Sequence, residues 1–403
     1  MSYDLIIVGA GIAGLYTGLN YIKQFPKHKV IILEKYDYVG GRIVTYRKPQ
    51  LQWEIGAGRI ASDHYMVKKL MKQYGLTWID IPNTSTWLSG KSDKPNPFEN
   101  LIPTLLAPLA SLPKSILATN TLADLLREIH GSKINTFIQQ FPYYCELHTL
   151  RADLALLSFS ITGEMGPKAS FGVCTEGLDS IITHMANEFI KLGGIIQIKS
   201  PVNNVIDKSV ILENGTKLTG KNIVLALHAK ALQQIPSLKS WEPLKHLSME
   251  PLVRMYAVFP TSSDTWFHNM DKIVTNSKIR YIIPIDEKKG TVMISYTDGK
   301  DAKLWINLQN KKGNEAVKEE VMKEVRKLFP TISIPDPLLF KIHPWTEGCT
   351  YWLGGKYNPI EMSEKAHTIR NGVYCCGESI SLRQAWMEGA LESAEKVIKI
   401  LCK

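Results

Sequence analysis

Cysteine is scarce in this sequence, and apolar runs long enough to cross a membrane are missing. Six cysteines among 403 residues are too few for a disulfide scaffold, and no two are spaced as Cys-x-x-Cys. The most apolar stretch, 101–113, contains three prolines and is shorter than the ~18 residues that a spanning helix needs. We therefore expect a protein without a membrane anchor, in the cytoplasm or another reducing intracellular compartment.

Several functional signals are also absent. The first residues lack the charged, apolar and cleavage regions of a signal peptide. The sequence contains no Gly-x-Ser-x-Gly segment, no Walker motif and none of the usual zinc-ligand spacings. We therefore expect neither a protein nucleophile nor a metal site.

Positive charge is in moderate excess. Lys and Arg number 48 against 38 Asp and Glu, which gives a net charge of +10 at pH 7. A basic balance suggests nucleic acid, an acidic membrane surface or an anionic ligand as partner. No helix-turn-helix pattern or basic-aromatic stripe supports nucleic acid. We therefore expect an anionic cofactor and no nucleic-acid partner, and the sequence leaves the oligomeric state open.

The first forty residues carry the sharpest positive signal. The β-branched run 3–8 predicts a buried strand, and Gly9-Ala-Gly11-Ile-Ala13-Gly14 follows it directly. The pattern then predicts a helix over 12–25 and a strand over 29–33 that ends in Glu34. This is the dinucleotide-binding order of strand, glycine turn, helix, strand and acid, in which the glycines let the backbone approach a pyrophosphate. An acid at position 34 suits ribose hydroxyls and disfavours a 2′-phosphate.

Further segments separate FAD from NAD. Gly40-Gly41-Arg42 and Gly56-Ala57-Gly58-Arg59 follow Glu34, and near the C-terminus Gly377-Glu378 precedes Trp386-Met387-Glu388-Gly389-Ala390. With these segments the chain resembles the flavin-dependent amine oxidase family, which includes monoamine, polyamine and L-amino-acid oxidases. The resemblance is specific at both ends of the chain and looser between them.

The resemblance implies an α/β fold, in which a Rossmann-like FAD-binding domain of the glutathione-reductase type joins an α+β substrate-binding domain. The FAD-binding domain is predicted over 1–76, 170–235 and 345–403, and the substrate-binding domain over 77–169 and 236–344. The Pro- and Ser-rich segment 88–118 is predicted as a loop or cap near the site entrance. A Lys- and Glu-rich helix is predicted over 315–329.

FAD is thus the expected cofactor. The residues predicted to bind it are Gly9, Gly11, Ala13, Gly14, Glu34, Lys35, Gly41, Arg42, Gly56, Ala57, Gly58, Arg59, Val202, Cys349, Gly377, Glu378, Trp386 and Met387. In the family the arginine of Gly-Gly-Arg lies near the pyrophosphate, and the acid of Gly-Glu holds the ribityl chain. Monoamine oxidases bond the flavin through a cysteine that Cys349 resembles, so non-covalent binding is the expectation and a covalent link stays open.

The resemblance also implies the reaction. An amine is oxidised to an imine, which water hydrolyses to a carbonyl, and dioxygen reoxidises the flavin and leaves as hydrogen peroxide. The residues predicted to act on the substrate are Arg254, Trp386, Tyr351 and Trp345. Trp386 stands where monoamine oxidases place one aromatic ring beside the amine. Arg254 stands where the family usually has a lysine, which suggests slower reoxidation by oxygen or an acidic amine substrate.

Two other functions stay open at this level. The chain can be another FAD oxidoreductase on the same scaffold, such as a desaturase or a protoporphyrinogen-oxidase-like enzyme, or a non-catalytic flavoprotein. The sequence does not name the amine, because the predicted substrate-binding domain is where the resemblance is weakest. His64, His228 and His343 lie near the motifs, and we interpret them as structural residues rather than proton-transfer groups.

Overall fold

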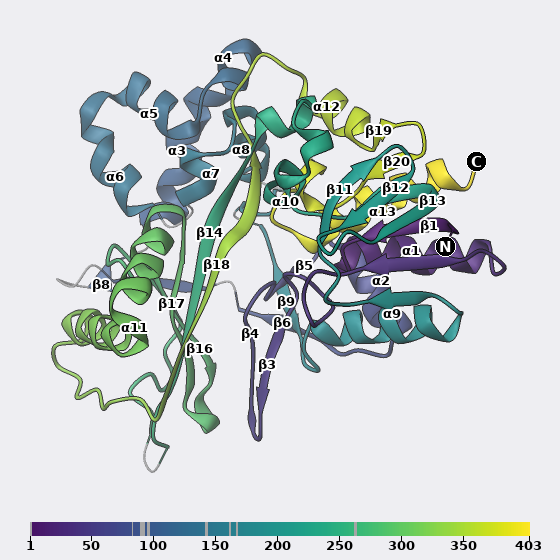
Figure 1. The fold of residues 1–403 in the computed structure, drawn as a ribbon. Helices are drawn as coiled ribbons and strands as arrows, with labels where there is room; N and C mark the ends of the chain where they lie inside the picture. The colour runs from purple at the N-terminus through teal and green to yellow at the C-terminus, as the bar shows by residue number, and fades with distance from the viewer. Residues whose placement is uncertain are drawn as a thin grey trace.

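The molecule is built around two main β-sheets (Figure 1). The computed structural model describes residues 2–82, 84–88, 93–94, 97–141, 144–160, 163–166, 168–261 and 264–403. One sheet has eight strands and lies beside both chain termini, and the other has seven strands and lies beneath a group of short helices. The mixed α/β fold predicted from the sequence is confirmed.

The eight-stranded sheet is drawn from three separate parts of the chain. Its strand order is β10-β2-β1-β13-β12-β11, and β20 pairs with both β13 and β19. The pairs β10–β2, β2–β1, β1–β13 and β13–β20 are parallel. The strands are β1 (Ser2–Val8), β2 (Val30–Leu33), β10 (Ile195–Gln197), β11 (Val202–Ile206), β12 (Ser209–Leu212), β13 (Lys217–Leu225), β19 (Thr368–Arg370) and β20 (Val373–Cys375).

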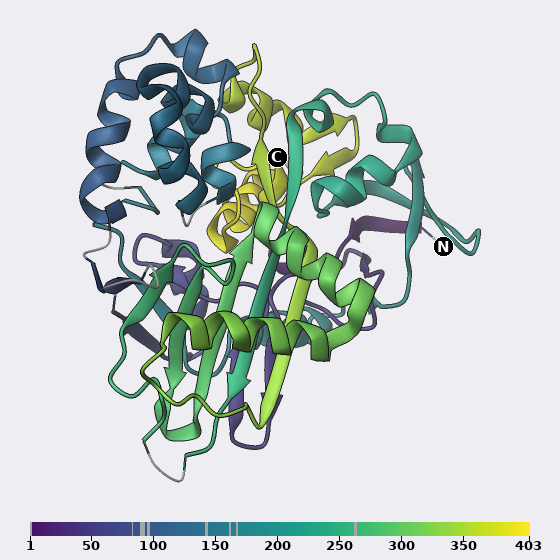
Figure 2. The same cartoon turned by 90° about the vertical axis from the view of Figure 1, so that its left-hand side faces the viewer.

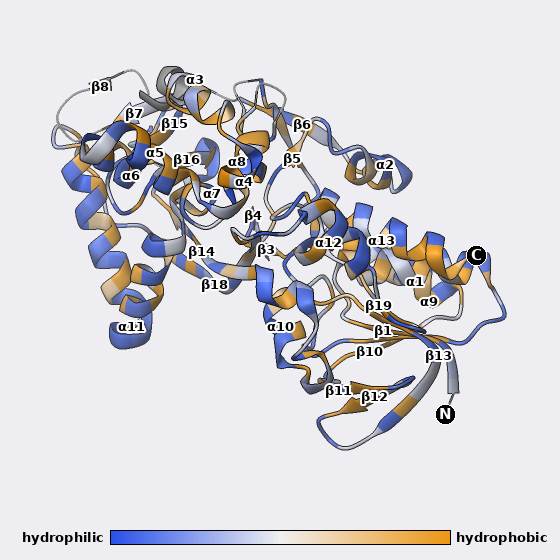
Figure 3. Ribbon diagram, turned by 90° about the horizontal axis from the view of Figure 1, so that it is seen from above, coloured by the Kyte–Doolittle hydropathy of each residue, from blue (hydrophilic) through white to orange (hydrophobic). Residues whose placement is uncertain are grey.

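Strand β1 is buried on both faces, as its continuous apolar run predicts. Leu5 and Ile7 pack into one hydrophobic cluster and Ile6 and Val8 into another, on opposite sides of the sheet. The first cluster includes helices α1 (Ile12–Gln24), α9 (Asp179–Lys191) and α13 (Met387–Leu401). In Figure 3 these helices show the mixed colouring of elements with one buried face.

The seven-stranded sheet is mostly antiparallel, in the order β18-β14-β17-β16-β15-β7-β8. Its strands are β7 (Ser85–Leu88), β8 (Asp93–Lys94), β14 (Leu247–Val258), β15 (Lys272–Thr275), β16 (Tyr281–Asp286), β17 (Thr291–Asp298) and β18 (Leu339–Trp352). Two smaller sheets lie between the main ones, formed by β3 (Thr45–Lys48) with β4 (Leu51–Glu54), and by β5 (Ile60–Ala61), β9 (Phe171–Cys174) and β6 (Trp78–Ile81).

Helix α11 (Gly299–Leu328) covers one face of the seven-stranded sheet (Figure 2). Its second half is the helix that the sequence predicts over 315–329. The sequence analysis did not predict the first half. Gly313, which has a φ of 80°, kinks the element between the two halves. Buried residues of both halves, including Trp305 and Val321, pack with strand residues of the sheet in one cluster.

The segment 88–118, predicted as a loop or cap, is helical over much of its length, so the prediction of a loop is wrong there. Helices α3 (Pro97–Ala110) and α4 (Lys114–Thr119) lie there, and residues 89–92 and 95–96 fall outside the described part. A proline inside a helix costs about 3 kcal/mol. Leu109 is fully buried and Leu105 and Leu106 pack against the core, so burial of this apolar face outweighs the prolines. The neighbouring helices are α5 (Leu122–His130), α6 (Asn135–Gln140), α7 (Tyr144–His148) and α8 (Ala152–Ser158).

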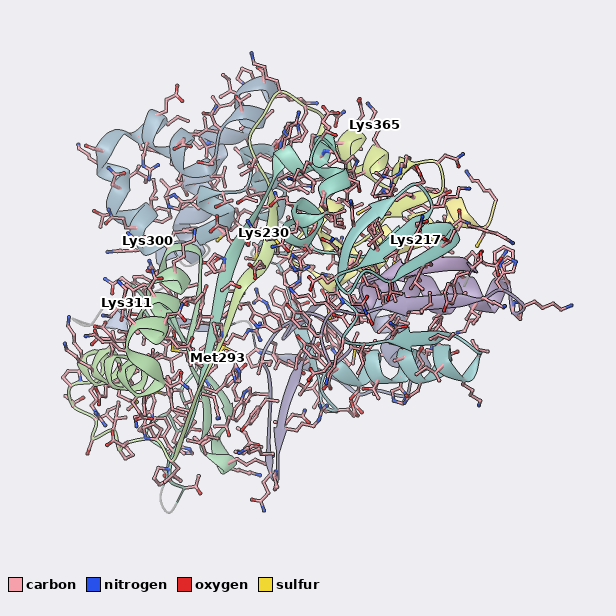
Figure 4. The ribbon with its side chains drawn as sticks, viewed as in Figure 1. Lys217, Lys230, Met293, Lys300, Lys311 and Lys365 are labelled. Atoms are coloured by element: carbon pink, nitrogen blue, oxygen red, sulfur yellow. The ribbon has the colours of Figure 1, made fainter. Side chains whose placement is uncertain are left out.

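The positive charge is spread over several elements. Figure 4 labels five exposed lysines, and they lie on four elements, with Lys217 on β13, Lys230 on α10 (Ala229–Gln234), Lys300 and Lys311 on α11, and Lys365 on α12 (Pro359–Ala366). These elements belong to both halves of the molecule. No helix in the described residues is long and apolar enough to cross a membrane.

Candidate functional site

One cavity of about 620 Å³ lies where the two main sheets meet. Its wall is made by the turn after β1, by the segment after β4, by β14, β17 and β18, and by the start of α13. Every residue predicted to bind the cofactor or the substrate lines this cavity, with the exception of Gly14. The structure thus brings together residues that are up to 378 positions apart, from Gly9 to Met387.

The glycine turn has the geometry that its sequence requires. Gly9 has a φ of 104°, in the region that favours glycine. A Cβ at Gly14 would overlap the carbonyl oxygen of Gly9, so Gly14 allows α1 to approach the turn closely. A Cβ at Gly11 would meet no atom within 4 Å, because this glycine borders the open cavity. The free N–H groups at the start of α1 therefore face space that an anion can occupy.

Glu34 is buried at the end of β2. One carboxylate oxygen accepts a hydrogen bond from the Ala10 N–H at 2.8 Å, and the other accepts one from the Tyr36 N–H at 3.0 Å. The side chain still lines the cavity, together with Lys35 and, across it, Val202 at the start of β11. A carboxylate has about four lone-pair sites, so two are left for a ligand.

Half-buried Arg42 and buried Glu378 form an ion pair in the wall of the cavity. Arg42 Nη2 donates to Glu378 Oε2 at 2.9 Å, and Arg42 Nη1 donates to the Gly348 carbonyl at 2.8 Å. Glu378 also accepts from the backbone N–H groups of Thr350 and Ala385. Burial alone would raise the pKa of Glu378, but Arg42 and these N–H groups outweigh it and lower the pKa below its usual range.

Cys349 lies beside this ion pair on β18. Burial and the nearby Glu378 carboxylate raise the pKa of its thiol to about 12. The thiolate is the nucleophilic form of cysteine. The environment therefore favours the protonated, less nucleophilic form of Cys349 near neutral pH.

Arg254 lies against the Gly56–Arg59 segment. A Cβ at Gly58 would overlap Arg254 Nη1. The same Nη1 donates to the Glu54 carbonyl at 3.3 Å, and the guanidinium carbon is 5.2 Å from the centre of the Tyr296 ring. Its Nε–H is buried without a hydrogen-bond partner in the described part of the chain. Arg254 thus holds a fixed positive charge in the cavity wall.

The aromatic residues predicted to face the substrate, Trp345, Tyr351 and Trp386, all lie in the cavity wall. Trp386 stacks at 6.0 Å on Phe171 and makes an edge contact at 5.0 Å with His64. Trp345 donates its indole N–H to the Ile55 carbonyl at 2.6 Å. Tyr351 lies two residues beyond Cys349 on β18 and is buried.

Arg59 belongs to this aromatic end of the cavity. Its guanidinium lies 4.1 Å from the centre of the Phe171 ring and 5.5 Å from that of Trp386. Sequence reasoning did not find Phe171, because it lies on β9, more than 100 residues from either Arg59 or Trp386, and no motif marks it. It also missed two acids in the wall, Glu146 on α7 and Asp298 at the end of β17.

Two acids within the recognised motifs serve as helix caps. Glu388 accepts hydrogen bonds from the N–H groups of Met66 and Val67, in the first turn of helix α2 (Tyr65–Gln73). Glu54 accepts one from the Leu178 N–H at the start of α9, and burial raises its pKa to about 7. These contacts satisfy N–H groups that a helix end leaves free, so both acids stabilise the frame around the cavity.

The three histidines make structural contacts. His64 is fully buried and accepts from the Ala61 N–H, and His228 accepts from the Ala231 N–H in the first turn of α10. His343 accepts from the Trp53 indole N–H at 3.1 Å. Burial lowers the pKa of His228 and of His343 to about 4, so both are neutral near pH 7.

Comparison with known proteins identifies the class. The family model of flavin containing amine oxidoreductases matches residues 12–397, nearly the whole chain. The chain therefore belongs to the flavin containing amine oxidoreductase family, and it is an enzyme of that family, a flavin-dependent amine oxidase.

Individual relatives are distant. An L-amino-acid oxidase of Siganus canaliculatus is 22% identical over 454 residues, which cover 98% of this chain and 84% of the relative. An L-amino-acid oxidase of Demansia vestigiata is 38% identical over 74 residues, which cover 18% of this chain and 14% of the relative. Among solved structures, putrescine oxidase bound to putrescine superposes with a TM-score of 0.75 at 16% identity, over 100% of both chains. This last likeness concerns the fold, and it agrees with the predicted Rossmann-like domain.

Proposed function

We propose that this enzyme uses FAD and dioxygen to oxidise the C–H bond next to an amine nitrogen, which gives an imine and hydrogen peroxide. The observation that carries the proposal is that one continuous cavity joins a dinucleotide-type glycine turn, with Glu34 at one end, to aromatic residues that include Trp386 at the other. The division into an FAD-binding domain (1–76, 170–235 and 345–403) and a substrate-binding domain (77–169 and 236–344) is part of this proposal.

The residues of the cavity fit FAD. The open space beside Gly11 leaves room for a pyrophosphate at the start of α1, and the spare lone pairs of Glu34 suit ribose hydroxyls. Arg42 supplies positive charge between these groups and α13. The first N–H groups of α13, at Met387, suit the part of a flavin that becomes negative on reduction. FAD, when bound, accepts the two electrons of the amine and passes them to dioxygen.

The protein contributes orientation and desolvation. Trp386 and Trp345 line the cavity, where they offer apolar ring surface to the substrate and exclude water, which favours the neutral amine needed for oxidation. The Arg254 guanidinium stays charged at all relevant pH values, so it cannot exchange a proton as a lysine does.

A peroxide-coupled screen of monoamines, polyamines and amino acids tests the proposal. At least one amine should yield peroxide, and the same amine should bleach the flavin absorbance without oxygen. Loss of flavin colour with a polyene or a porphyrinogen, but with no amine, would instead identify another oxidoreductase on this scaffold.

The Arg254 substitution tests the reoxidation step. We expect Arg254→Lys to speed reoxidation of the reduced flavin by oxygen about tenfold, below the ~10²–10⁴ that a positioned proton-transfer group can supply. Arg254→Met should give no such gain, because methionine has neither charge nor donor. Stopped-flow mixing of reduced enzyme with oxygen measures both variants. Unchanged oxygen rates and unchanged substrate affinities in both would make Arg254 purely structural.

The next prediction concerns whether the cofactor is covalently attached. Because the Cys349 thiol stays protonated, we propose that FAD is bound without a covalent link. Acid denaturation followed by filtration should release the yellow colour into the filtrate. Cys349→Ala should release the same fraction, and colour retained with wild-type protein but lost from this variant would demonstrate a covalent bond.

A further inference from the structure

The indole ring of Trp386 is held by aromatic side chains that stand behind the cavity wall. Trp386 lines the cavity, whereas His64 and Phe171 are not among the described residues that line it. His64 meets the indole edge-on, with ring centres 5.0 Å apart and planes at 75°. Phe171 stacks on it at 6.0 Å, with planes at 10°. Aromatic pairs attract each other in both arrangements, so two neighbours at different angles fix the plane of the indole.

The imidazole of His64 is itself held at both of its nitrogens. The side chain is fully buried, and Nδ1 accepts a hydrogen bond from the Ala61 N–H at 3.2 Å. A neutral imidazole has one donor and one acceptor nitrogen, so Nε2 carries the hydrogen and donates it to Glu164 Oε1 at 3.3 Å. Because the two bonds lie on different sides of the ring, the imidazole cannot turn without breaking one of them.

Glu164 connects His64 back to the segment that carries Trp386. Its Oε1 lies 3.2 Å from Arg383 Nε, and Arg383 stands shortly before Trp386 in the sequence. Arg383 Nη2 also lies 3.3 Å from the Oδ2 of Asp63, the residue before His64. The contacts therefore form a closed loop that runs from Trp386 to His64, then to Glu164, and returns through Arg383 to Trp386.

Helix α2 is capped without this imidazole. His64 precedes the first residue of α2, but its side chain makes no capping hydrogen bond to the helix in the described residues. Glu388 satisfies the helix start instead, because its carboxylate accepts from the Met66 and Val67 N–H groups. The two hydrogen bonds of the imidazole therefore serve the orientation of its own ring, and loss of the imidazole should leave α2 in place.

We propose that His64 is a positioning residue for Trp386, and that its hydrogen bond to Glu164 fixes the angle at which the indole faces the substrate. This inference rests on the proposed amine oxidation and adds a residue that acts on it through Trp386. His64 exchanges no proton with the substrate, because both of its nitrogens are engaged. Histidine suits this place better than phenylalanine, which packs edge-on equally well but has no nitrogen to bond to Ala61 and Glu164.

A double-variant cycle tests whether His64 acts through Trp386. With an amine that the enzyme oxidises, His64→Leu should lower kcat/KM about 10- to 100-fold, the scale of a small misplacement within a site. In the Trp386→Leu protein, which has no ring to orient, the same change should cost less than about twofold. Equal losses in the two backgrounds would overturn the proposal, because a purely structural role of His64 would act in both.

Variants of Glu164 keep the test open if His64→Leu does not fold. Glu164→Ala removes the acceptor of the His64 Nε2–H and should lower kcat/KM about three- to tenfold, the scale of one hydrogen bond. Glu164→Gln keeps an acceptor in its amide oxygen and should lose less than the alanine variant. Glu392→Gln is the matched control, because this acid pairs at 3.9 Å with Arg383 rather than with His64. No loss in Glu164→Ala, or an equal loss in the control, would contradict the assignment.

Near-ultraviolet circular dichroism of the holoenzyme observes the indole without turnover. The contribution of Trp386 is the difference between the wild-type spectrum and that of Trp386→Leu. We expect the same difference, taken in the His64→Leu or Glu164→Ala background, to lose most of its intensity, because an indole that changes its angle averages its signal. An unchanged difference spectrum would show that His64 does not position the ring.

The two kinds of measurement fail separately. If no amine is oxidised while the Trp386 spectrum still depends on His64, the proposed oxidation fails and the positioning of the ring stands. If amines are oxidised but neither the spectrum nor kcat/KM depends on His64, the positioning fails and the oxidation stands.

Discussion

Gly11→Val should abolish FAD binding and leave the protein folded. A Cβ at Gly11 meets no protein atom within 4 Å, so the apoprotein tolerates it. The valine methyl groups would instead fill the space that the pyrophosphate needs at the start of α1. The cost to folding should be about 1 kcal/mol or less, the scale of a changed N-cap residue. Flavin absorbance of the purified variant and its thermal unfolding measure the two effects.

Gly14→Ala provides the contrast for this experiment. Its Cβ would overlap the Gly9 carbonyl oxygen, so the variant should lose about 3 kcal/mol of stability through overpacking. Gly11→Ala should weaken FAD binding less than Gly11→Val does. A yellow Gly11→Val protein with wild-type FAD affinity would show that the pyrophosphate does not lie at this turn.

The second large effect concerns the ion pair between Arg42 and Glu378. Arg42→Met should destabilise the protein by about 3–5 kcal/mol, because it leaves a buried carboxylate without its cation. The double variant Arg42→Met/Glu378→Gln should be more stable than the sum of the single changes by about 0.5–3 kcal/mol. Denaturant unfolding of the four proteins measures this coupling, and strictly additive losses would refute it.

Lowering the pH also tests the contribution of Glu378 to stability. The pKa of Glu378 is lowered in the folded protein, so its contribution is present above the unfolded value of 4.5 and is lost as pH falls through the folded value. Wild-type protein should therefore lose stability below about pH 4.5 more steeply than Glu378→Gln. Equal slopes would mean that other carboxylates dominate the acid unfolding.

Sequence patterns predicted an element correctly where the residues of that one segment are enough to determine its structure. The run 3–8 predicts a strand buried on both faces, and its neighbouring residues Leu5 and Ile6 fall in different hydrophobic clusters, as alternation along a strand predicts. Helix α3 was missed because its prolines are a local signal, whereas the burial of Leu109 that outweighs them comes from distant elements. Propensity therefore failed where tertiary packing decided.

The candidate site was likewise predicted where a local motif marks the residues and missed where distant residues come together. The residues predicted to bind the cofactor or the substrate all line the cavity, apart from Gly14. The pair of Glu146 and Asp298 is invisible in the sequence, because 152 positions separate the two acids and neither belongs to a motif. Glu378, predicted to hold the ribityl chain, also binds Arg42 and two backbone N–H groups, and no motif shows such a network.

The assembly of the first sheet has a consequence for synthesis on the ribosome. The Tyr16 hydroxyl on α1 donates to Glu395 on α13, 379 residues later. At ~5–20 residues per second, about 20–80 s pass between the emergence of these two residues. During that interval β20 and α13 have not yet been synthesised, so the glycine turn lies beside an incomplete sheet. A nascent chain should therefore acquire its cofactor only after the last helix has left the exit tunnel.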